Sequence, residues 1–223
     1  MSSNNQILSI YKSRKNILTI LNTLGYETDE YQSFSINEVD AMLSNDQLDM
    51  LIENPKTNQK AYIKYFTTSR QIRQGVLDEI IEDLYAIENV LEKKDNLIII
   101  IEDEPNDSIV ARLRYLFDHD GIFVVVHNMR RLQFNILDHN LVPACSVLNT
   151  QEKKLFMEKY NVKDDKQLPE ISRFDPQSLA LCVRPGDVCK FTRKSITALE
   201  SEYYRICVWV PPILYYILYR NII

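Results

Sequence analysis

The chain has 223 residues, of which 45% are hydrophobic and 10% aromatic, so it can build one large core or two smaller ones, and wholesale disorder is excluded. Charged residues make up 26% of it, and the net charge of −5 excludes a protein that coats nucleic acid through bulk positive charge. With only 4 glycines, the sequence also argues against the glycine-rich phosphate-binding loops of most nucleotide-binding enzymes.

The 4 cysteines form no CxxC pair and have no histidine at metal-ligand spacing. We expect reduced thiols in a reducing compartment, with neither a bound metal nor another cofactor. The longest apolar stretch, residues 206–219, contains two prolines and is shorter than the ~20 residues of a membrane-spanning helix. No membrane partner is therefore expected.

Charge is unevenly distributed along the chain. Residues 1–138 carry 14 basic and 22 acidic residues, a net charge of −8, whereas residues 139–223 carry 12 and 9, a net charge of +3. The sign changes beside Pro143, and proline ends regular structure. We therefore expect an N-terminal domain at 1–138, a C-terminal domain at 139–208 and an apolar extension at 209–223.

The pattern of the first 70 residues predicts two helices and two strands. Apolar residues recur at helical spacing over 4–24, and Gly25 follows as a cap. The capping-box sequence that begins at Ser35 predicts a second, short helix. Residues 48–52 and 61–66 are then expected as strands joined by a polar turn.

An α/β layer fold is predicted for the rest of the N-terminal domain. Apolar positions spaced by three or four predict a long helix over 69–94. Two continuous apolar runs, 97–101 and 122–126, are typical of central strands covered on both faces, and 107–117 is expected as a helix between them. Strand, helix and strand in this order imply a right-handed crossover.

One alternative is a metal-dependent nuclease built on this domain. Glu102 and Asp103 follow a predicted strand, where open α/β sheets place their chemistry, and Asp49 could be the first metal-binding acid of a restriction-enzyme-type site. The second strand, however, has Tyr62 two residues before Lys64, where such a site requires an acid or an amide. The residues favour a scaffold without an active site, and the nuclease stays an alternative.

The C-terminal part is expected to be a small α+β unit. Thr150 can cap a helix whose apolar face is Leu155, Phe156 and Tyr160. Asp175 and Pro176 are typical of the start of another short helix. A turn at 185–187 and strands at 188–193 and 203–208 complete the unit.

Six ordered blocks in this part resemble the assembly domain of the H-family component of archaeal RNA polymerases and of its eukaryotic counterpart, the fifth subunit shared by the nuclear RNA polymerases. The blocks are 139–143, 167–171, 175–176, 184–188, 193–198 and 204–205. The stretch from Tyr11 to Tyr26 is similar to the first helix of the eukaryotic form, whose added N-terminal domain is an α/β jaw with a restriction-endonuclease-like layer fold. Divergence, the apolar tail and a composition typical of AT-rich coding favour a large DNA virus as the source.

The resemblance implies a non-catalytic subunit of a multisubunit DNA-dependent RNA polymerase that acts in transcription. Its C-terminal domain would bind the largest subunit, and its N-terminal domain would form part of the lower jaw beside downstream duplex DNA. It would reside in the nucleus of a cell, or in the virion and the host cytoplasm or nucleus of a virus. A free-standing scaffold that binds transcription factors is a further alternative.

Two sets of site residues follow from this resemblance. Several of the assembly residues are expected to set the domain's own turns and strand register rather than touch a partner. The assembly candidates are Pro143, Leu168, Pro169, Asp175, Pro176, Gly186, Ser195, Thr197, Tyr204 and Arg205. The DNA-proximal candidates are Lys12, Arg14, Lys15, Arg70 and Arg73.

The chain also departs from the family pattern at four positions. Cys145 stands where a histidine is usual, Cys182 and Leu199 where glycines are usual, and Ile196 where the eukaryotic form has an acid. Leucine does not readily adopt the positive φ that glycine allows. We therefore expect the loop at 195–202 to have a changed backbone.

Overall fold

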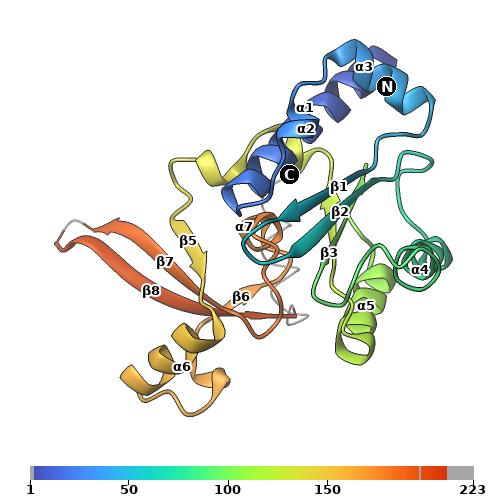
Figure 1. The fold of residues 1–223 in the computed structure, drawn as a ribbon. Helices are drawn as coiled ribbons and strands as arrows, with labels where there is room; N and C mark the ends of the chain where they lie inside the picture. Colours follow the sequence, from blue (N-terminus) through green and yellow to red (C-terminus); the bar gives the residue numbers. More distant parts are fainter. Residues whose placement is uncertain (1–2, 196, 210–223) are drawn as a thin grey trace. The chain divides into compact units, whose positions relative to one another are not determined.

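The computed structural model describes residues 3–195 and 197–209 of the chain (Figure 1). Contacts divide the chain into two units, Met1–Asn135 and Ile136–Ile223. The division lies a few residues before the expected boundary at residue 138. Of the expected apolar extension, only Trp209 is among the described residues, and Ile196 also lies outside them.

A four-stranded sheet forms the middle of the first unit (Figure 1). Its order is β1-β2-β3-β4, with β1 antiparallel to β2 and the other pairs parallel. Every residue of β3 and β4 is buried, as the continuous apolar runs predicted. The strands are β1 (Met50–Asn54), β2 (Gln59–Tyr65), β3 (Asn96–Ile101) and β4 (Val124–Asn128).

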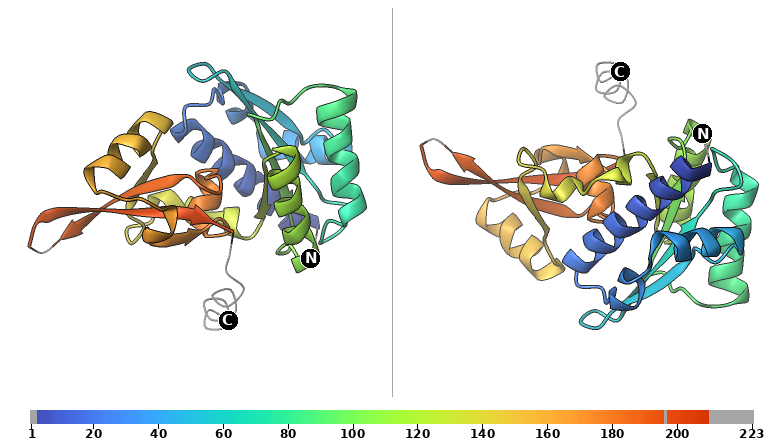
Figure 2. Two further views of the ribbon diagram at one scale, coloured as in Figure 1. Left: turned by 90° about the horizontal axis from the view of Figure 1, so that it is seen from below. Right: turned by 90° about the horizontal axis from the view of Figure 1, so that it is seen from above.

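Helices cover both faces of this sheet (Figure 2). On one face lies α1 (Ser3–Thr23), whose Ser13 Oγ is 3.2 Å from the hydroxyl of Tyr65 in β2. The crossover helices cover the other face: α4 (Gln74–Glu82) with the π-helical turn η1 (Asp83–Ile87), and α5 (Asp107–Tyr115) with η2 (Leu116–Asp120). The α/β layer arrangement of the N-terminal unit is therefore helix, sheet, helix.

Local capping signals mark the end of α1 and the start of α3. Gly25 follows α1 with φ 89°, as a C-terminal glycine cap requires. Ser35 and Glu38 form the predicted capping box at the start of α3 (Ile36–Ser44). Short helices α2 (Asp29–Gln32) and η3 (Arg131–Gln133) complete the unit.

The helix predicted over residues 69–94 is wrong in extent, because the observed helix begins five residues after the predicted start and ends seven residues before the predicted end. Ile72 and Leu91 belong to the apolar pattern but lie outside the helix, although they are only 1% and 3% exposed. Asn89 has φ 49°, which does not continue a right-handed helix. Flanking loop residues that pack into the core thus extended the helical pattern beyond the helix.

The second unit is built on a four-stranded sheet of order β5-β7-β8-β6 (Figure 1). A long antiparallel hairpin, β7 (Val188–Ser195) and β8 (Leu199–Val208), forms its middle. Its edges are the short strands β5 (Ala144–Val147) and β6 (Glu170–Ser172), which the pattern did not predict. The helices are η4 (Ile136–Asp138), α6 (Thr150–Lys159), η5 (Asp165–Gln167) and α7 (Pro176–Ala180).

Two capping predictions in this unit have different outcomes. Asp175 caps α7 with Pro176 at the first turn, as predicted, and its Oδ1 accepts from the amide of Gln177 at 2.9 Å. The cap of α6 is Asn149 rather than Thr150. Asn149 forms a full capping box with Glu152, and an amide side chain is at least as good an N-cap as threonine.

Two apolar clusters pack around this sheet. Phe156 of α6 belongs to one of them, and Phe191 of β7 to the other. The buried members are Phe156, Leu168, Val188 and Ile206 in the first cluster, and Ile171, Val183, Cys189, Phe191 and Cys207 in the second. In the part of the chain that the structure describes, no helix is long and apolar enough to cross a membrane.

Candidate functional site

Four of the predicted assembly residues hold the second unit together. Asp175 and Pro176 start α7, and the carbonyl of Pro143 accepts from Gln177 Nε2 at 2.7 Å. Leu168 is 8% exposed inside an apolar cluster. These side chains and backbone groups are occupied within the unit, so their first role is to set its turns and its packing.

The other assembly candidates lie at or near the surface of the unit. Arg205 and Thr197 are exposed, and Ser195 is half-buried at the end of the hairpin. Pro169 is exposed, and its carbonyl accepts from the amide of Ile206 at 2.9 Å. These four residues are placed where a partner could reach them.

Gly186 and Tyr204 make contacts inside the unit and are also partly accessible to a partner. Gly186 is exposed with φ 91°, and its amide donates to the carbonyl of Cys207 at 2.8 Å. The ring of Tyr204 lies 4.3 Å from that of Phe156, and its hydroxyl donates to Glu202 Oε2 at 3.3 Å. Each therefore combines a structural contact with an accessible face.

An open hollow of about 420 Å³ lies next to α6, and no sequence pattern predicted it. Val147, Leu155, Tyr160 and Tyr204 are among the residues that line it. Leu155 and Tyr160 were predicted on the apolar face of α6, and they are 66% and 52% exposed, whereas Phe156 is the buried residue of that helix. The same helical spacing that predicted an apolar face thus produced an exposed apolar surface.

The cations predicted to lie near DNA differ in exposure. Lys12, Lys15, Arg70 and Arg73 are exposed, and Arg70 Nε lies 3.9 Å from Glu102 Oε2. Arg14 does not fit the expectation of a surface cation, because it is 3% exposed. It belongs to the stripe of α1 that faces the unit's interior, and its Nη1 donates to the carbonyl of Leu48 at 2.8 Å.

The described structure gives the nuclease alternative no support at its proposed carboxylates. Asp49 does lie beside Lys64, with 2.9 Å between Oδ2 and Nζ, but the hydroxyl of Tyr62 donates to the same oxygen at 3.0 Å. Burial and then the charge of Asp49 raise the pKa of Tyr62, so it stays a donor and not a ligand. Within residues 3–195 and 197–209, no group of three acidic, histidine or cysteine side chains could hold a metal ion.

Glu102 and Asp103 are engaged by arginines instead. Asp103 Oδ1 lies 3.6 Å from Arg130 Nη2, while Glu102 faces Arg70. These pairs are partly exposed and contribute little to stability. They give the end of β3 an ion-paired surface.

Comparison with known proteins identifies the second unit. The family model described as "RNA polymerase Rpb5, C-terminal domain" matches residues 134–207. The "DNA-directed RNA polymerase subunit Rpo5" of Thermococcus kodakarensis is 45% identical over 76 residues, which are 34% of this chain and 92% of that relative. The chain belongs to the Rpb5/Rpo5 family. The resemblance drawn from the six sequence blocks is thereby confirmed.

Other Rpb5/Rpo5 relatives match to the same extent. The Rpo5 subunit of Pyrococcus abyssi is 45% identical over 76 residues, covering 34% of this chain and 92% of the relative. That of Archaeoglobus fulgidus is 39% identical over 77 residues, covering 34% of this chain and its own full length. The family match therefore centres on the second unit, and the nuclease alternative finds no support in it.

Cys182 and Leu199, which stand where the resemblance led us to expect glycines, both have a left-handed backbone. Cys182 has φ 51° and Leu199 has φ 60°. The expectation that leucine would force position 199 out of this region is wrong, because Leu199 adopts positive φ and still pairs with Ser195 in the hairpin. Its side chain is 86% exposed, so its size meets no obstacle in the unit. A leucine at this φ therefore carries backbone strain.

Replacing Leu199 with glycine is expected to raise the free energy of unfolding of the second unit by about 0.5–1 kcal/mol, because strain is relieved and no buried contact is lost. Denaturant unfolding followed by the fluorescence of Trp209, the single tryptophan, measures this. Glu200→Gly, at the neighbouring exposed strand position, is the matched control and should lower stability. A loss for Leu199→Gly as large as for the control would contradict strain at position 199.

Proposed function

We propose that this chain is a non-catalytic subunit of a multisubunit DNA-directed RNA polymerase and acts in transcription. One observation carries the proposal: the second unit matches 92% of the length of an archaeal Rpo5 subunit at 45% identity. Because this region makes up nearly all of the archaeal protein, it must include the surface through which that protein binds to its polymerase. The same surface on this chain is expected to do the same.

The second unit would anchor the chain to the largest polymerase subunit. The exposed candidates Pro169, Thr197 and Arg205, together with the half-buried Ser195, offer apolar, polar and charged contacts. The hollow beside α6 adds apolar and aromatic surface, with Leu155 and Tyr160 more than half exposed. Aromatic and aliphatic side chains in a depression, surrounded by polar groups, are typical of the energetically important part of a protein interface.

The first unit would act as part of the lower jaw beside downstream duplex DNA. Its net negative charge repels phosphates, and charges farther apart than a Debye length, about 8–10 Å at physiological salt, are largely screened, so any attraction must be local. Lys12 and Lys15 on α1, and Arg70 and Arg73 after β2, are the exposed cations for that role. The protein would then be found where its polymerase acts: in a nucleus, or in the virion and host cell of a large DNA virus.

Purification of the tagged full chain from its native source tests the proposal. The two largest polymerase subunits are expected to copurify with the wild-type chain. Leu155→Glu should reduce their recovery at least several-fold, because it puts a charge into an apolar contact. Gln151→Glu, an exposed residue of the same helix outside the hollow, is the matched control and should leave recovery unchanged.

Two results would contradict separate parts of the proposal, namely the polymerase assignment and the anchoring surface beside α6. If neither large subunit copurified with the wild-type chain, the polymerase assignment would be overturned and the free-standing scaffold favoured. If both were recovered equally with Leu155→Glu and with the control, the chain would be a polymerase subunit anchored through another surface. Thermal melting of each variant shows that a loss of recovery is not a loss of folding.

A further inference from the structure

A pocket of about 150 Å³ lies in the first unit, between α1 and the segment that contains α2 and α3. The helix contributes Tyr11, Arg14 and Lys15 to its lining, and the segment contributes Tyr31 and Phe34. No aspartate or glutamate is among the described residues that line it. Its volume is well above what a single water molecule needs.

Arg14 is a buried cation without a carboxylate. The side chain is 3% exposed, Nη1 donates to the carbonyl of Leu48 at 2.8 Å, and Nε has no hydrogen-bond partner. Among the described residues, Arg14 forms no ion pair. By contrast, the half-buried Arg112 and Arg131 of the same unit hold Asp78 and Glu104, each at 2.8 Å.

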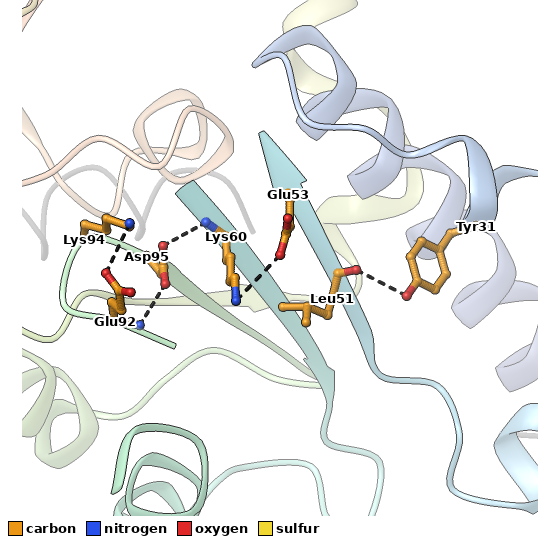
Figure 3. A network of polar contacts seen from close by, with 7 residues as sticks. All are labelled: Tyr31, Leu51, Glu53, Lys60, Glu92, Lys94 and Asp95. Atoms are coloured by element: carbon orange, nitrogen blue, oxygen red, sulfur yellow. Dashed lines mark hydrogen bonds and ion pairs between the residues drawn. The ribbon is translucent and has the colours of Figure 1, made fainter. Parts of the chain in front are cut away.

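The surroundings stabilise the charge of Arg14 only in part. The guanidinium carbon lies 5.8 Å from the centre of the Tyr31 ring and 5.5 Å from that of Phe34, within the range of cation–π attraction. The Tyr31 hydroxyl donates to the carbonyl of Leu51 at 3.2 Å, which restrains the ring of this pocket-lining residue (Figure 3). Burial lowers the pKa of Arg14, but arginine does not lose its proton in a protein, so a buried positive charge remains.

The geometry favours one kind of anion. Lys15 is exposed at the pocket and has no ion pair in the part of the chain that the structure describes, so two positive charges face one site. Leu18 and Val39 add apolar walls. A carboxylate on a thin methylene stem can pass such walls and present two oxygens to a guanidinium. The phosphodiester of nucleic acid has a sugar on each side and is too broad to reach an arginine that is only 3% exposed.

We propose that this pocket binds the carboxylate of a glutamate or aspartate side chain presented by a partner protein, with Arg14 as the buried partner of the charge and Lys15 at the entrance. The proposal does not depend on membership of a polymerase, because it rests on the charges and the burial of the first unit alone. It adds a site for a protein ligand on the unit that the family match does not cover.

NMR titration of the full chain tests the site directly, because the Arg14 Nε–H group gives its own nitrogen–proton signal. The probes are butyrate, which has the carboxylate and stem of glutamate, its neutral counterpart butyramide, a capped pentapeptide with one central glutamate between glycines, and the same peptide with glutamine. Butyrate and the glutamate peptide are expected to shift the Arg14 signal in a saturable way at millimolar concentration. Butyramide and the glutamine peptide should not shift it.

Variants separate the site from general charge attraction. Lys15→Met should weaken the binding of butyrate several-fold, and its exposed position makes a folding defect unexpected. Lys12→Met removes an exposed charge from the same helix outside the pocket and should change nothing. Arg14→Met should abolish binding, as seen in the signals of the neighbouring backbone amides, and circular dichroism checks that it folds.

Three outcomes would overturn the proposal. If neither butyrate nor the glutamate peptide produced a saturable shift in the wild-type chain, Arg14 would be purely structural. A response to butyrate without one to the glutamate peptide would indicate a site for small free carboxylates and not for a protein partner. Tighter binding of inorganic phosphate than of butyrate, lost in Lys15→Met, would assign the pocket to phosphate instead.

Discussion

Replacing Phe156 with alanine is expected to lower the free energy of unfolding of the second unit by about 3–5 kcal/mol. Phe156 is 8% exposed and is the buried residue of α6. Its ring lies 4.3 Å from that of Tyr204 and 5.1 Å from that of Tyr160, and it packs with Leu168 and Val188. Removal of the ring leaves a cavity under the helix, so α6 loses most of its apolar contact with the sheet.

Tryptophan fluorescence during denaturant unfolding measures this loss in the second unit alone. Trp209, the single tryptophan, belongs to that unit, with its ring 6.1 Å from Phe174 and 4.6 Å from the guanidinium of Arg173. Leu155→Ala is the matched control: it truncates the neighbouring residue, which is 66% exposed, and should change stability by less than about 0.5 kcal/mol. Equal losses in the two variants would mean that Phe156 is not what holds α6.

Helix α6 also shows what apolar spacing can and cannot predict. Leu155, Phe156 and Tyr160 were expected to share one apolar face, and of the three only Phe156 is buried. Which of the three meets a core depends on Val188 and Ile206, which belong to strands far along the chain. Spacing identifies the residues that could be buried, and the tertiary partner decides among them.

Elements whose cause lies within a few residues were predicted well. The glycine cap at Gly25, the capping box at Ser35 and the cap at Asp175 each depend on contacts across two to five residues, and all three are present. The buried strands β3 and β4 were also found, although β4 begins later than expected. The edge strands β5 and β6 were missed, because four and three residues carry too short a pattern and their pairing partners are distant in sequence.

For the candidate site too, the sequence predicted some features and not others. Ordered sequence blocks were sufficient to recognise the Rpb5/Rpo5 unit, which the family model matches over residues 134–207. They could not separate a residue used inside the unit, such as Leu168, from an exposed one, such as Arg205. Arg14 was expected at the surface because arginines usually are, and only tertiary contacts with Leu48, Tyr31 and Phe34 bury it.

The second large effect is expected at Asp95, a fully buried carboxylate where the chain enters β3 (Figure 3). Its Oδ1 accepts from the amide of Lys60 at 2.8 Å, and its Oδ2 accepts from the amide of Glu92 at 2.7 Å. The first bond continues the β2–β3 ladder, whose pairing begins one residue later at Ala61 and Asn96. The second closes the turn that leads into the strand. One side chain therefore ties together two backbone segments that no local pattern joins.

Asp95→Ala leaves both amides without their acceptor and should lower the free energy of unfolding of the first unit by about 2–4 kcal/mol. Asp95→Asn keeps one acceptor oxygen and turns a donor toward the other amide, so its loss should be intermediate. Native-state hydrogen exchange of the β2 and β3 amides measures both. Lys94→Ala, which breaks the exposed 3.1 Å pair with Glu92, is the matched control, with a change of at most about 0.5 kcal/mol.

The three variants together distinguish backbone capping from general charge effects at this turn. If the carboxylate acted by its charge alone, Asp95→Asn would lose as much as Asp95→Ala, because both remove the charge. If it acts as an acceptor, the loss follows the number of amides left unsatisfied, and protection should fall first at Lys60 and Glu92 and then along β2 and β3. Because β3 and β4 are completely buried and lie next to each other, weakening this entry turn is expected to reduce the protection of the whole sheet rather than of its edge.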